Sequence, residues 1–387
     1  MKNNSEGLEK TGISKKKRVI FAIVAAFLTL ILISGIGELV LRVLPVRGTR
    51  VECFEFDPLV GTHFYPHSTV IYCNDKGNSI RRKVNSFGYL DTEHNKEKKI
   101  GVYRIGFFGD SFTDARQVVL EETFFKIIER KLKDYNVESL SFGVSGFGTI
   151  QSYLNSKRYA DYFDLDLVVY VFCENDLGDN IKEIKKSPNF PSAVLKENGF
   201  GIDYSFRGRN NFKKKTAYRA YNHLKRYSLL MSTVVNRMRL LMAHGVKVKV
   251  TEEDVMMGGE SEADRIPDGN DFPSSWPDKW REYAQSLISA IILRWQSDVD
   301  ARSGEFAILY IPRQGEMEKE TEKQNSWKPL LESLSTRNKI AFIDPTSDLL
   351  KTEMSGKKVF HDHFSNDGHI AFAETFVDWF VGAHKKT

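Results

Sequence analysis

The chain has 387 residues, of which 41% are apolar and 28% are charged. These fractions are typical of a folded globular protein and exclude an extended disordered chain. The formal net charge of +5 is concentrated in residues 1–18, which contain six Lys or Arg and two Glu, so the remaining chain is about neutral. This distribution argues against nucleic acid as a partner.

The first predicted element is a membrane-spanning helix. Residues 19–37, VIFAIVAAFLTLILISGIG, are nineteen consecutive uncharged residues, which is long enough to cross a bilayer. The basic tail at residues 1–18 predicts a cytoplasmic N-terminus and an extracytoplasmic remainder. No small-x-small cleavage site ends the apolar run. We therefore expect an uncleaved signal anchor over residues 19–44 of a single-pass cell-membrane protein, rather than a cleaved signal peptide or a buried helix.

A lead-in segment is predicted at residues 45–100, with Gly and Asn punctuation and a charged end, HNKEKK. Cys53 and Cys73 lie in it, and in an exported protein such a pair can form a disulfide where the geometry permits. Cys173 lies in an apolar run and is expected to be a buried thiol. No Cys/His set has zinc spacing, and we expect no metal and no cofactor.

Strands and helices alternate through residues 101–387. Such alternation predicts an α/β fold, here a three-layer α/β/α (flavodoxin-like) parallel sheet. The apolar runs predict strands at 103–108, 137–142, 167–173, 306–311 and 340–343, and the 3.6-residue spacing predicts helices at 122–135, 286–295 and 370–380.

A long insertion, about residues 185–275, has no place in this alternation. Within it, residues 204–251 contain twelve Lys or Arg and no Asp or Glu. This composition fits the solvated face of a basic helix. It also fits a surface that binds anionic lipid headgroups or an acidic polymer.

Four stretches follow one another at predicted strand ends and before the last helix: RIGFFGDSFT, FGVSGFGTIQ, VVYVFCENDLGDN and HDHFSNDGHIAFAE. Their order and residues resemble the SGNH (GDSL-type) hydrolase superfamily over about residues 101–387. FDPLVG and NSFGY in the lead-in resemble its membrane-anchored bacterial members. The resemblance implies a serine nucleophile at Ser111 and an oxyanion hole formed by the N–H groups of Ser111 and Gly146 and the side chain of Asn175. It also implies a histidine base ahead of the last helix.

The chemistry explains these residue types. A serine hydroxyl needs a base to take its proton, and donors must stabilise the oxyanion that then develops. The resemblance favours His363 as the base through HFSNDG, with His361 as the rival. His369 is expected inside the last helix, with Ser365 as its N-cap. As alternatives, Gly146 can be a simple turn glycine and Asn175 a loop cap.

The sequence offers two alternatives for the partner of the histidine. The family aspartate usually lies two or three residues before the histidine, where Phe360 and His361 stand here. Asp362 is directly adjacent to His363, and neighbouring side chains on an extended segment point to opposite faces. Asp362 therefore completes a triad only if the chain turns there; otherwise a Ser–His dyad remains.

These features predict an extracytoplasmic serine esterase that hydrolyses O-acyl esters, with a small acyl group on a carbohydrate, through an acyl-serine intermediate. The first alternative is an O-acyltransferase that uses the same residues to modify a cell-envelope or secreted polysaccharide. The second is a non-catalytic module that binds the envelope and keeps the fold. The substrate expectation depends on localisation and on the resemblance, because fold alone does not specify a substrate.

Overall fold

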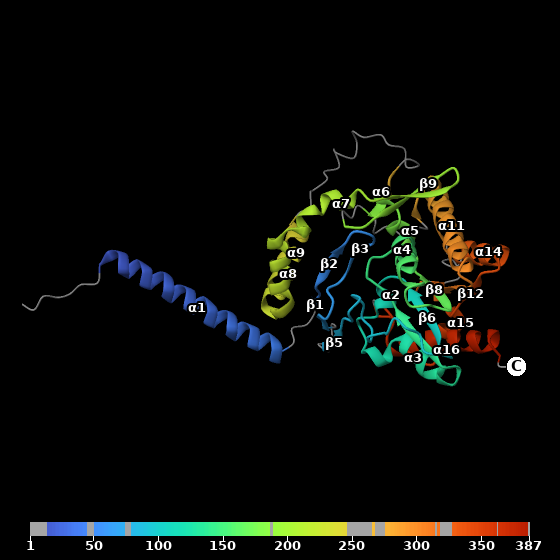
Figure 1. Ribbon diagram of the computed structural model, residues 1–387, viewed down its shortest axis with the longest axis horizontal. Coiled ribbons are helices and arrows are strands. Elements are labelled where there is room, and N and C mark those ends of the chain that lie inside the picture. Colours follow the sequence, from blue (N-terminus) through green and yellow to red (C-terminus); the bar gives the residue numbers. More distant parts are fainter. Residues whose placement is uncertain are drawn as a thin grey trace, which may run out of the picture.

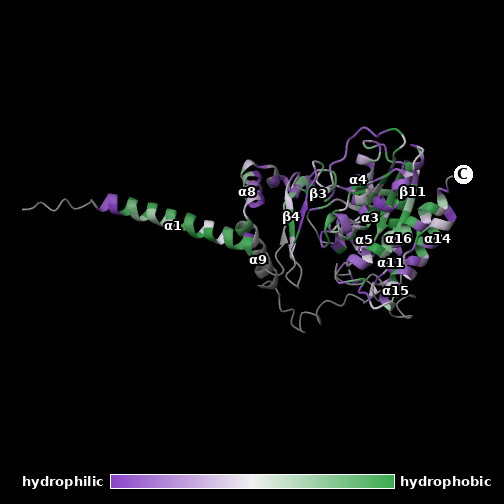
Figure 2. Ribbon diagram, turned by 90° about the horizontal axis from the view of Figure 1, so that it is seen from below, coloured by the Kyte–Doolittle hydropathy of each residue, from purple (hydrophilic) through white to green (hydrophobic). Residues whose placement is uncertain are grey.

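The computed structural model describes the chain in several stretches separated by short gaps. The described residues are 14–44, 50–73, 79–185, 189–245, 265–267, 275–313, 316–317, 327–361 and 363–385. The predicted membrane anchor is one continuous helix, α1 (Lys15–Val43), which projects away from the rest of the chain (Figure 1). None of its residues is buried, and Figure 2 shows it hydrophobic over most of its length. By length and composition, α1 can cross a membrane.

A parallel five-stranded sheet forms the centre of the folded part. Its strand order is β12–β11–β8–β6–β7, which is the 2-1-3-4-5 order of a flavodoxin-like doubly wound sheet. The predicted fold class is therefore confirmed. Each strand also lies within one residue of its predicted bounds: β6 (Tyr103–Phe108), β7 (Val137–Ser141), β8 (Leu167–Phe172), β11 (Glu305–Tyr310) and β12 (Ala341–Ile343).

Helices cover both faces of this sheet. Because successive side chains of a strand point to opposite faces, each strand contributes side chains to a hydrophobic cluster on either face. In β8, Val168 and Tyr170 enter one hydrophobic cluster, whereas Val169 and Val171 enter the other. The first cluster contains residues of α4 (Thr149–Tyr159), α11 (Asp278–Asp300) and α14 (Lys328–Asn338). The second contains residues of α3 (Phe124–Lys131), α15 (Thr346–Met354) and α16 (Asn366–Ala383).

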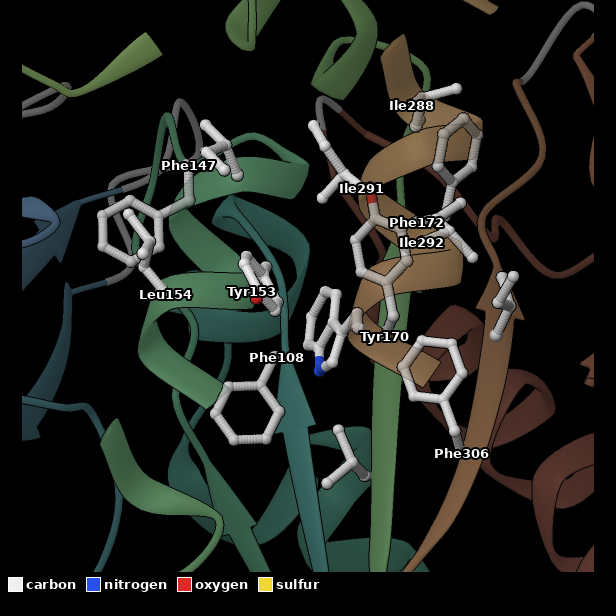
Figure 3. Packing of buried hydrophobic residues seen from close by; sticks show 14 of the residues in the cluster. Phe108, Phe147, Tyr153, Leu154, Tyr170, Phe172, Ile288, Ile291, Ile292 and Phe306 are labelled. Carbon is white, nitrogen blue, oxygen red and sulfur yellow. The ribbon is translucent and has the colours of Figure 1, made fainter. Parts of the chain in front are cut away.

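Aromatic rings fill much of the cluster beneath α4 and α11 (Figure 3). Phe108 of β6, Tyr170 of β8, Phe306 of β11 and Tyr153 of α4 all contact Trp295 of α11, with ring centroids 5.1–6.0 Å apart. Buried aromatic side chains contribute large apolar areas, and edge-to-face pairs add to that stabilisation. This packing fixes α4, and with it the loop that precedes α4, against the strand ends.

The lead-in segment contains strands of its own. β2 (Phe54–Asp57) and β3 (Gly61–Phe64) form a hairpin, and β1 (Arg50–Val51), β4 (Thr69–Cys73) and β5 (Ser79–Lys83) form an antiparallel sheet. Cys53 is a buried free thiol. The β1–β4 register pairs Arg50 with Tyr72 and Val51 with Ile71, so Cys53 and Cys73 lie toward opposite ends of this ladder. A disulfide needs Cα atoms within about 7 Å, and positions toward opposite ends of a ladder do not favour it.

A buried histidine holds the lead-in against the central sheet. His94 Nδ1 lies 2.8 Å from Glu138 of β7, and its Nε2 lies 3.0 Å from Asp91. Asp91 also accepts a hydrogen bond from Ser141 N–H (2.9 Å) and pairs with Lys126 (3.1 Å). Burial opposes protonation of His94, but the hydrogen bonds to the two carboxylates outweigh it and raise the pKa of His94 to about 9. His94 is therefore protonated and forms ion pairs with the carboxylates of Asp91 and Glu138.

The insertion begins with a hairpin and continues as helices. In Figure 1, α8 and α9 lie between α1 and the domain that contains the central sheet. The elements of the insertion are β9 (Ser192–Lys196), β10 (Gly199–Asp203), α7 (Phe206–Arg209), η3 (Asn211–Lys214), α8 (Thr216–Tyr227) and α9 (Leu229–Gly245). Short helices in the loops of the central domain are α2 (Ser111–Asp114), η1 (Leu120–Glu122), η2 (Lys133–Tyr135), α5 (Asp176–Asp179) and α6 (Lys182–Lys185).

Candidate active site

Ser111 begins the short helix α2 directly after strand β6. Asp110 is the N-cap of α2, and its Oδ1 accepts a hydrogen bond from Phe112 N–H (2.9 Å). Position 109, directly before Asp110, requires glycine, because a Cβ on Gly109 would lie 2.8 Å from the carbonyl oxygen of Val171 on β8. The chain can therefore turn sharply here and hold Ser111 half-buried at the carboxyl edge of the sheet. This edge, between β6 and β8, is the topological switch point at which doubly wound sheets bind ligands.

His363 is the histidine that contacts Ser111. Its Nε2 lies 2.7 Å from Ser111 Oγ, a distance suited to proton transfer. The ring of Phe112 packs against the imidazole with centroids 4.7 Å apart. His361 is exposed, and its backbone N–H donates to the carbonyl of His363 (2.9 Å).

Ser365 and His369 occupy the positions in α16 that the sequence predicts. Ser365 is the N-cap of α16, and its Oγ accepts from Gly368 N–H (3.2 Å), as predicted. His369 lies inside that helix and is fully buried. Burial lowers the pKa of His369 to about 3, and its Nδ1 accepts from the N–H of Phe124 (3.3 Å). His369 is thus a neutral core residue.

The chain reverses direction between Phe360 and Phe364. Phe360 and Phe364 form an isolated antiparallel bridge, and the hydrogen bond from His361 N–H to the His363 carbonyl closes the turn between them. The predicted orienting acid, Asp362, lies outside the described residues. An aspartate directly adjacent to the histidine can serve as its partner only where the chain turns, as it does between Phe360 and Phe364.

Asn175 follows β8 and lies beside Asp110. Its Nδ2 donates to Asp110 Oδ2 (3.1 Å) and to Asp179 Oδ2 (3.2 Å). Asp110 Oδ2 also lies 3.4 Å from Ser111 Oγ, so one carboxylate oxygen faces both the hydroxyl and the amide. Burial raises the pKa of Asp110 to about 6, although the bonds from Phe112 N–H and Asn175 oppose the shift.

Gly146 lies in the loop between β7 and α4. Its φ of +79° is a left-handed conformation that favours glycine, and a Cβ there would meet nothing within 4 Å. The loop therefore leaves open space beside Gly146. Gly146 and Ser111 are both half-buried and Asn175 is exposed, so solvent and ligands can reach all three residues.

Lys185 is a residue of this region that the sequence reasoning missed. Its side chain is only 11% exposed, its Nζ donates to the carbonyl of Gly146, and Asp179 lies 3.4 Å away. The ammonium also lies 4.3 Å from the centroid of the Phe190 ring. Burial lowers the pKa of Lys185 despite the neighbouring Asp179. No local motif marks this lysine, because its partners come from other loops.

A second set of residues that the sequence did not indicate, Asp114, Arg116 and Ser145, supports the floor of the site. Asp114 accepts hydrogen bonds from Ser145 N–H and Ser145 Oγ, each 3.0 Å. Arg116 pairs with Asp114 and with Glu52 of the lead-in, and it donates to Ser145 Oγ. These contacts connect the lead-in, the Ser111 turn and the Gly146 loop. The lead-in is therefore part of the structure that supports the site.

Neither a protein-family model nor a curated protein matches the sequence. The chain is similar in structure to the acetyl xylan esterase AlAXEase, at 13% identity and a TM-score of 0.35, over 71% of this chain and 98% of that one. It is similar to a member of the lipolytic G-D-S-L family from Veillonella parvula, at 11% identity and a TM-score of 0.36, over 72% and 98% of the two chains. For TesA the identity is 10% and the TM-score 0.36, over 70% and 94%.

Proposed function

We propose that the protein is a membrane-anchored serine esterase that cleaves O-acyl esters through an acyl-Ser111 intermediate. The observation that carries the proposal is the 2.7 Å contact between His363 Nε2 and Ser111 Oγ at the carboxyl edge of a parallel sheet. A serine hydroxyl becomes an effective nucleophile only beside such a base. The site is also open to solvent, as an enzyme of this kind requires.

The reaction follows from this pair. Ser111 Oγ attacks the ester carbonyl carbon while its proton passes to His363 Nε2. The N–H groups of Ser111 and Gly146 stabilise the oxyanion of the tetrahedral intermediate, together with the Asn175 amide, which exchanges one of its carboxylate hydrogen bonds for one to the oxyanion. The intermediate collapses to the acyl-serine ester, and the alcohol leaves with the proton from His363. Water then attacks the acyl-serine with His363 again as base, which releases the carboxylic acid and free Ser111.

The proposed substrate is a small acyl ester on a carbohydrate of the cell envelope or of a secreted polymer. The helix α1 tethers the enzyme, and the basic residues before its apolar run favour a cytoplasmic N-terminus. An extracytoplasmic catalytic domain meets acylated polymers at the cell surface. Protease added to spheroplasts should therefore digest the chain beyond Leu44 and spare residues 1–14; protection of the catalytic domain would contradict this orientation.

The direct test is turnover of a short panel of acyl esters by the full-length protein in detergent. We expect release of carboxylic acid from short-chain O-acyl sugars, and no release by Ser111→Ala. Assays that also contain an unacylated glycan separate hydrolysis from transfer, because an O-acyltransferase forms the acylated glycan instead of free acid. A folded protein without either product and without serine reactivity would contradict the proposal and favour an envelope-binding module.

A further inference from the structure

The end of the anchor helix is fastened to the corner between α8 and α9. The carboxylate of Glu38 accepts hydrogen bonds from Leu229 N–H (3.0 Å), Leu230 N–H (2.9 Å) and Ser228 Oγ (3.0 Å). The first N–H groups of a helix have no partner within the helix, so a carboxylate at this position is strongly stabilising. Arg42 Nη2 donates to the Tyr227 carbonyl (3.0 Å), which ties the last turn of α1 to the same corner.

The sequence of α1 sets the depth of this corner. The uncharged run of residues 19–37 ends directly before Glu38. At 1.5 Å per residue, about 20 residues span the roughly 30 Å hydrocarbon core of a bilayer. With Val19 at one edge of the core, Glu38 reaches the other edge, and the α8–α9 corner lies at the boundary between lipid and water.

The two helices extend across the end of α1 rather than along it. Figures 1 and 2 both show α1 lengthwise, with α8 and α9 crossing its end between α1 and the central sheet. A helix pair that crosses the end of a membrane-spanning helix lies along the membrane surface. We define the α8–α9 collar as residues 216–245.

The collar makes buried contacts with the protein and also carries exposed apolar and basic side chains. In the buried contacts, Lys225 donates to the Glu52 carbonyl (3.1 Å), and Ser232 Oγ donates to the Lys225 carbonyl (2.8 Å). Four exposed apolar side chains and two exposed arginines lie elsewhere on these helices: Leu224, Tyr227, Val234, Met238, Arg219 and Arg237.

The exposed apolar side chains form helical pairs. Leu224 and Tyr227 are three residues apart, and Val234 and Met238 are four apart, so each pair shares one helix face. Single exposed apolar residues are ordinary, but these pairs lie on the two helices whose corner is tied to the end of α1, in a segment without acidic residues. Apolar side chains combined with arginine are characteristic of helices that lie in the headgroup region of a bilayer.

We propose that the α8–α9 collar lies on the surface of the membrane that α1 crosses. The four apolar side chains enter the interfacial region, and Arg219 and Arg237 lie near anionic headgroups. The inference rests on the proposed anchoring by α1, but it holds for either orientation, because the collar and the end of α1 lie on the same side. The collar thereby holds the catalytic domain at a fixed height above the lipid.

The test uses the full-length protein in nanodiscs that contain anionic lipid. Met238→Cys and Val234→Cys, each in a Cys73→Ser background, carry an environment-sensitive fluorophore. Burial raises the pKa of the Cys53 and Cys173 thiols, which slows their labelling. Tyr162→Cys provides the control, because Tyr162 is exposed on the catalytic domain.

Lipids with a nitroxide near the headgroup should quench the two collar probes by roughly half or more, since interfacial helices sit about 5–10 Å into the headgroup boundary. The Tyr162 probe should remain unquenched. Reversing both arginines, Arg219→Glu with Arg237→Glu, should lower the quenching in anionic nanodiscs but not in zwitterionic ones.

Resistance of the chain to alkaline extraction reports insertion of α1 separately. Protein that resists alkaline extraction but has unquenched collar probes would overturn the inference about the collar, while the proposed anchoring by α1 would stand. Collar probes that respond to a soluble acidic polysaccharide and not to nitroxide lipid would identify an acidic polymer as the partner instead. Quenching that depends on the number of chains per nanodisc would indicate a second copy, which also overturns it.

Discussion

His363 Nε2 lies 2.7 Å from Ser111 Oγ, although the two residues are 252 positions apart in the sequence. The β6–α2 turn holds the serine, and packing against Phe112 together with the turn before α16 holds the histidine. Because neither side chain can perform nucleophilic catalysis without the other, their removal should have similar and non-additive effects.

Ser111→Ala should abolish labelling of the full-length protein by a fluorophosphonate probe. Only an activated serine reacts rapidly with this reagent, and the proximity of His363 supplies the activation. Ser205→Ala removes an exposed serine outside the site and should leave labelling unchanged. Equal labelling of wild type and Ser111→Ala would show that another residue is the nucleophile.

His363→Ala should lower kcat nearly as much as Ser111→Ala does. His361→Ala should retain most of the activity, because His361 is exposed and His363 occupies the position beside Ser111. Steady-state kinetics of the two variants provide the comparison. If His361→Ala is the inactive protein, the assignment of the base is incorrect.

The loss of kcat in an Asp362 variant distinguishes a catalytic triad from a Ser–His dyad. Since the chain turns between Phe360 and Phe364, we expect Asp362→Asn to lower kcat strongly, by up to ~10⁴ as for an orienting aspartate. A loss of only about ten-fold would instead indicate a Ser–His dyad with Asp362 as a helper. Thermal unfolding of the variant should match that of wild type in either case.

Asn175→Ala should lower kcat by ~10²–10³ with little change in KM, because an oxyanion donor acts mainly in the transition state. The exposed Asn198 of the β9–β10 turn offers a matched control, and Asn198→Ala should leave kcat unchanged. Asn175 also donates to Asp110 and Asp179. Unfolding of the variant without a specific kcat effect would therefore identify Asn175 as a structural tie.

Lys185→Met should lower kcat because the lysine holds the Gly146 carbonyl and thus the orientation of the loop. Small misplacements of positioned groups cost up to about 10²-fold in rate, and we expect a loss of ten- to hundred-fold with KM nearly unchanged. Lys182→Met removes a neighbouring lysine that pairs with Asp203 on the surface, and it should retain activity. Equal activities of the two variants would exclude a positioning role for Lys185.

Stability should fall as pH rises because of His94. Its folded pKa of about 9 lies above the ordinary value of 6.5, so protonated His94 stabilises the fold fully below about pH 6.5 and loses this effect through pH 9. The shift corresponds to about 3 kcal/mol as an upper estimate. Denaturant unfolding at pH 6 and pH 9.5 should show this loss for wild type and for His67→Gln, an exposed control. His94→Gln should show a smaller pH dependence; an unchanged dependence would exclude His94 as its source.

The sequence by itself determined the elements whose signals are local. The strands of the central sheet are buried on both faces, so each appears as a short continuous apolar run. The anchor helix appears as an uncharged run of membrane length, and the alternation of strands with helices indicates the parallel doubly wound sheet. Ser111 could be selected because its motif is the first of four stretches that occur in the order of the SGNH superfamily.

Tertiary structure decided the features that depend on contacts between distant segments. His361 and His363 are two residues apart, and only the turn closed by Phe360 and Phe364 brings His363 rather than His361 to Ser111. Lys185 gains its role from Gly146, 39 positions away, and Glu38 gains its role from a helix that begins 191 positions later. Local propensity and periodicity contain no information about such pairs, because packing of the whole chain creates them.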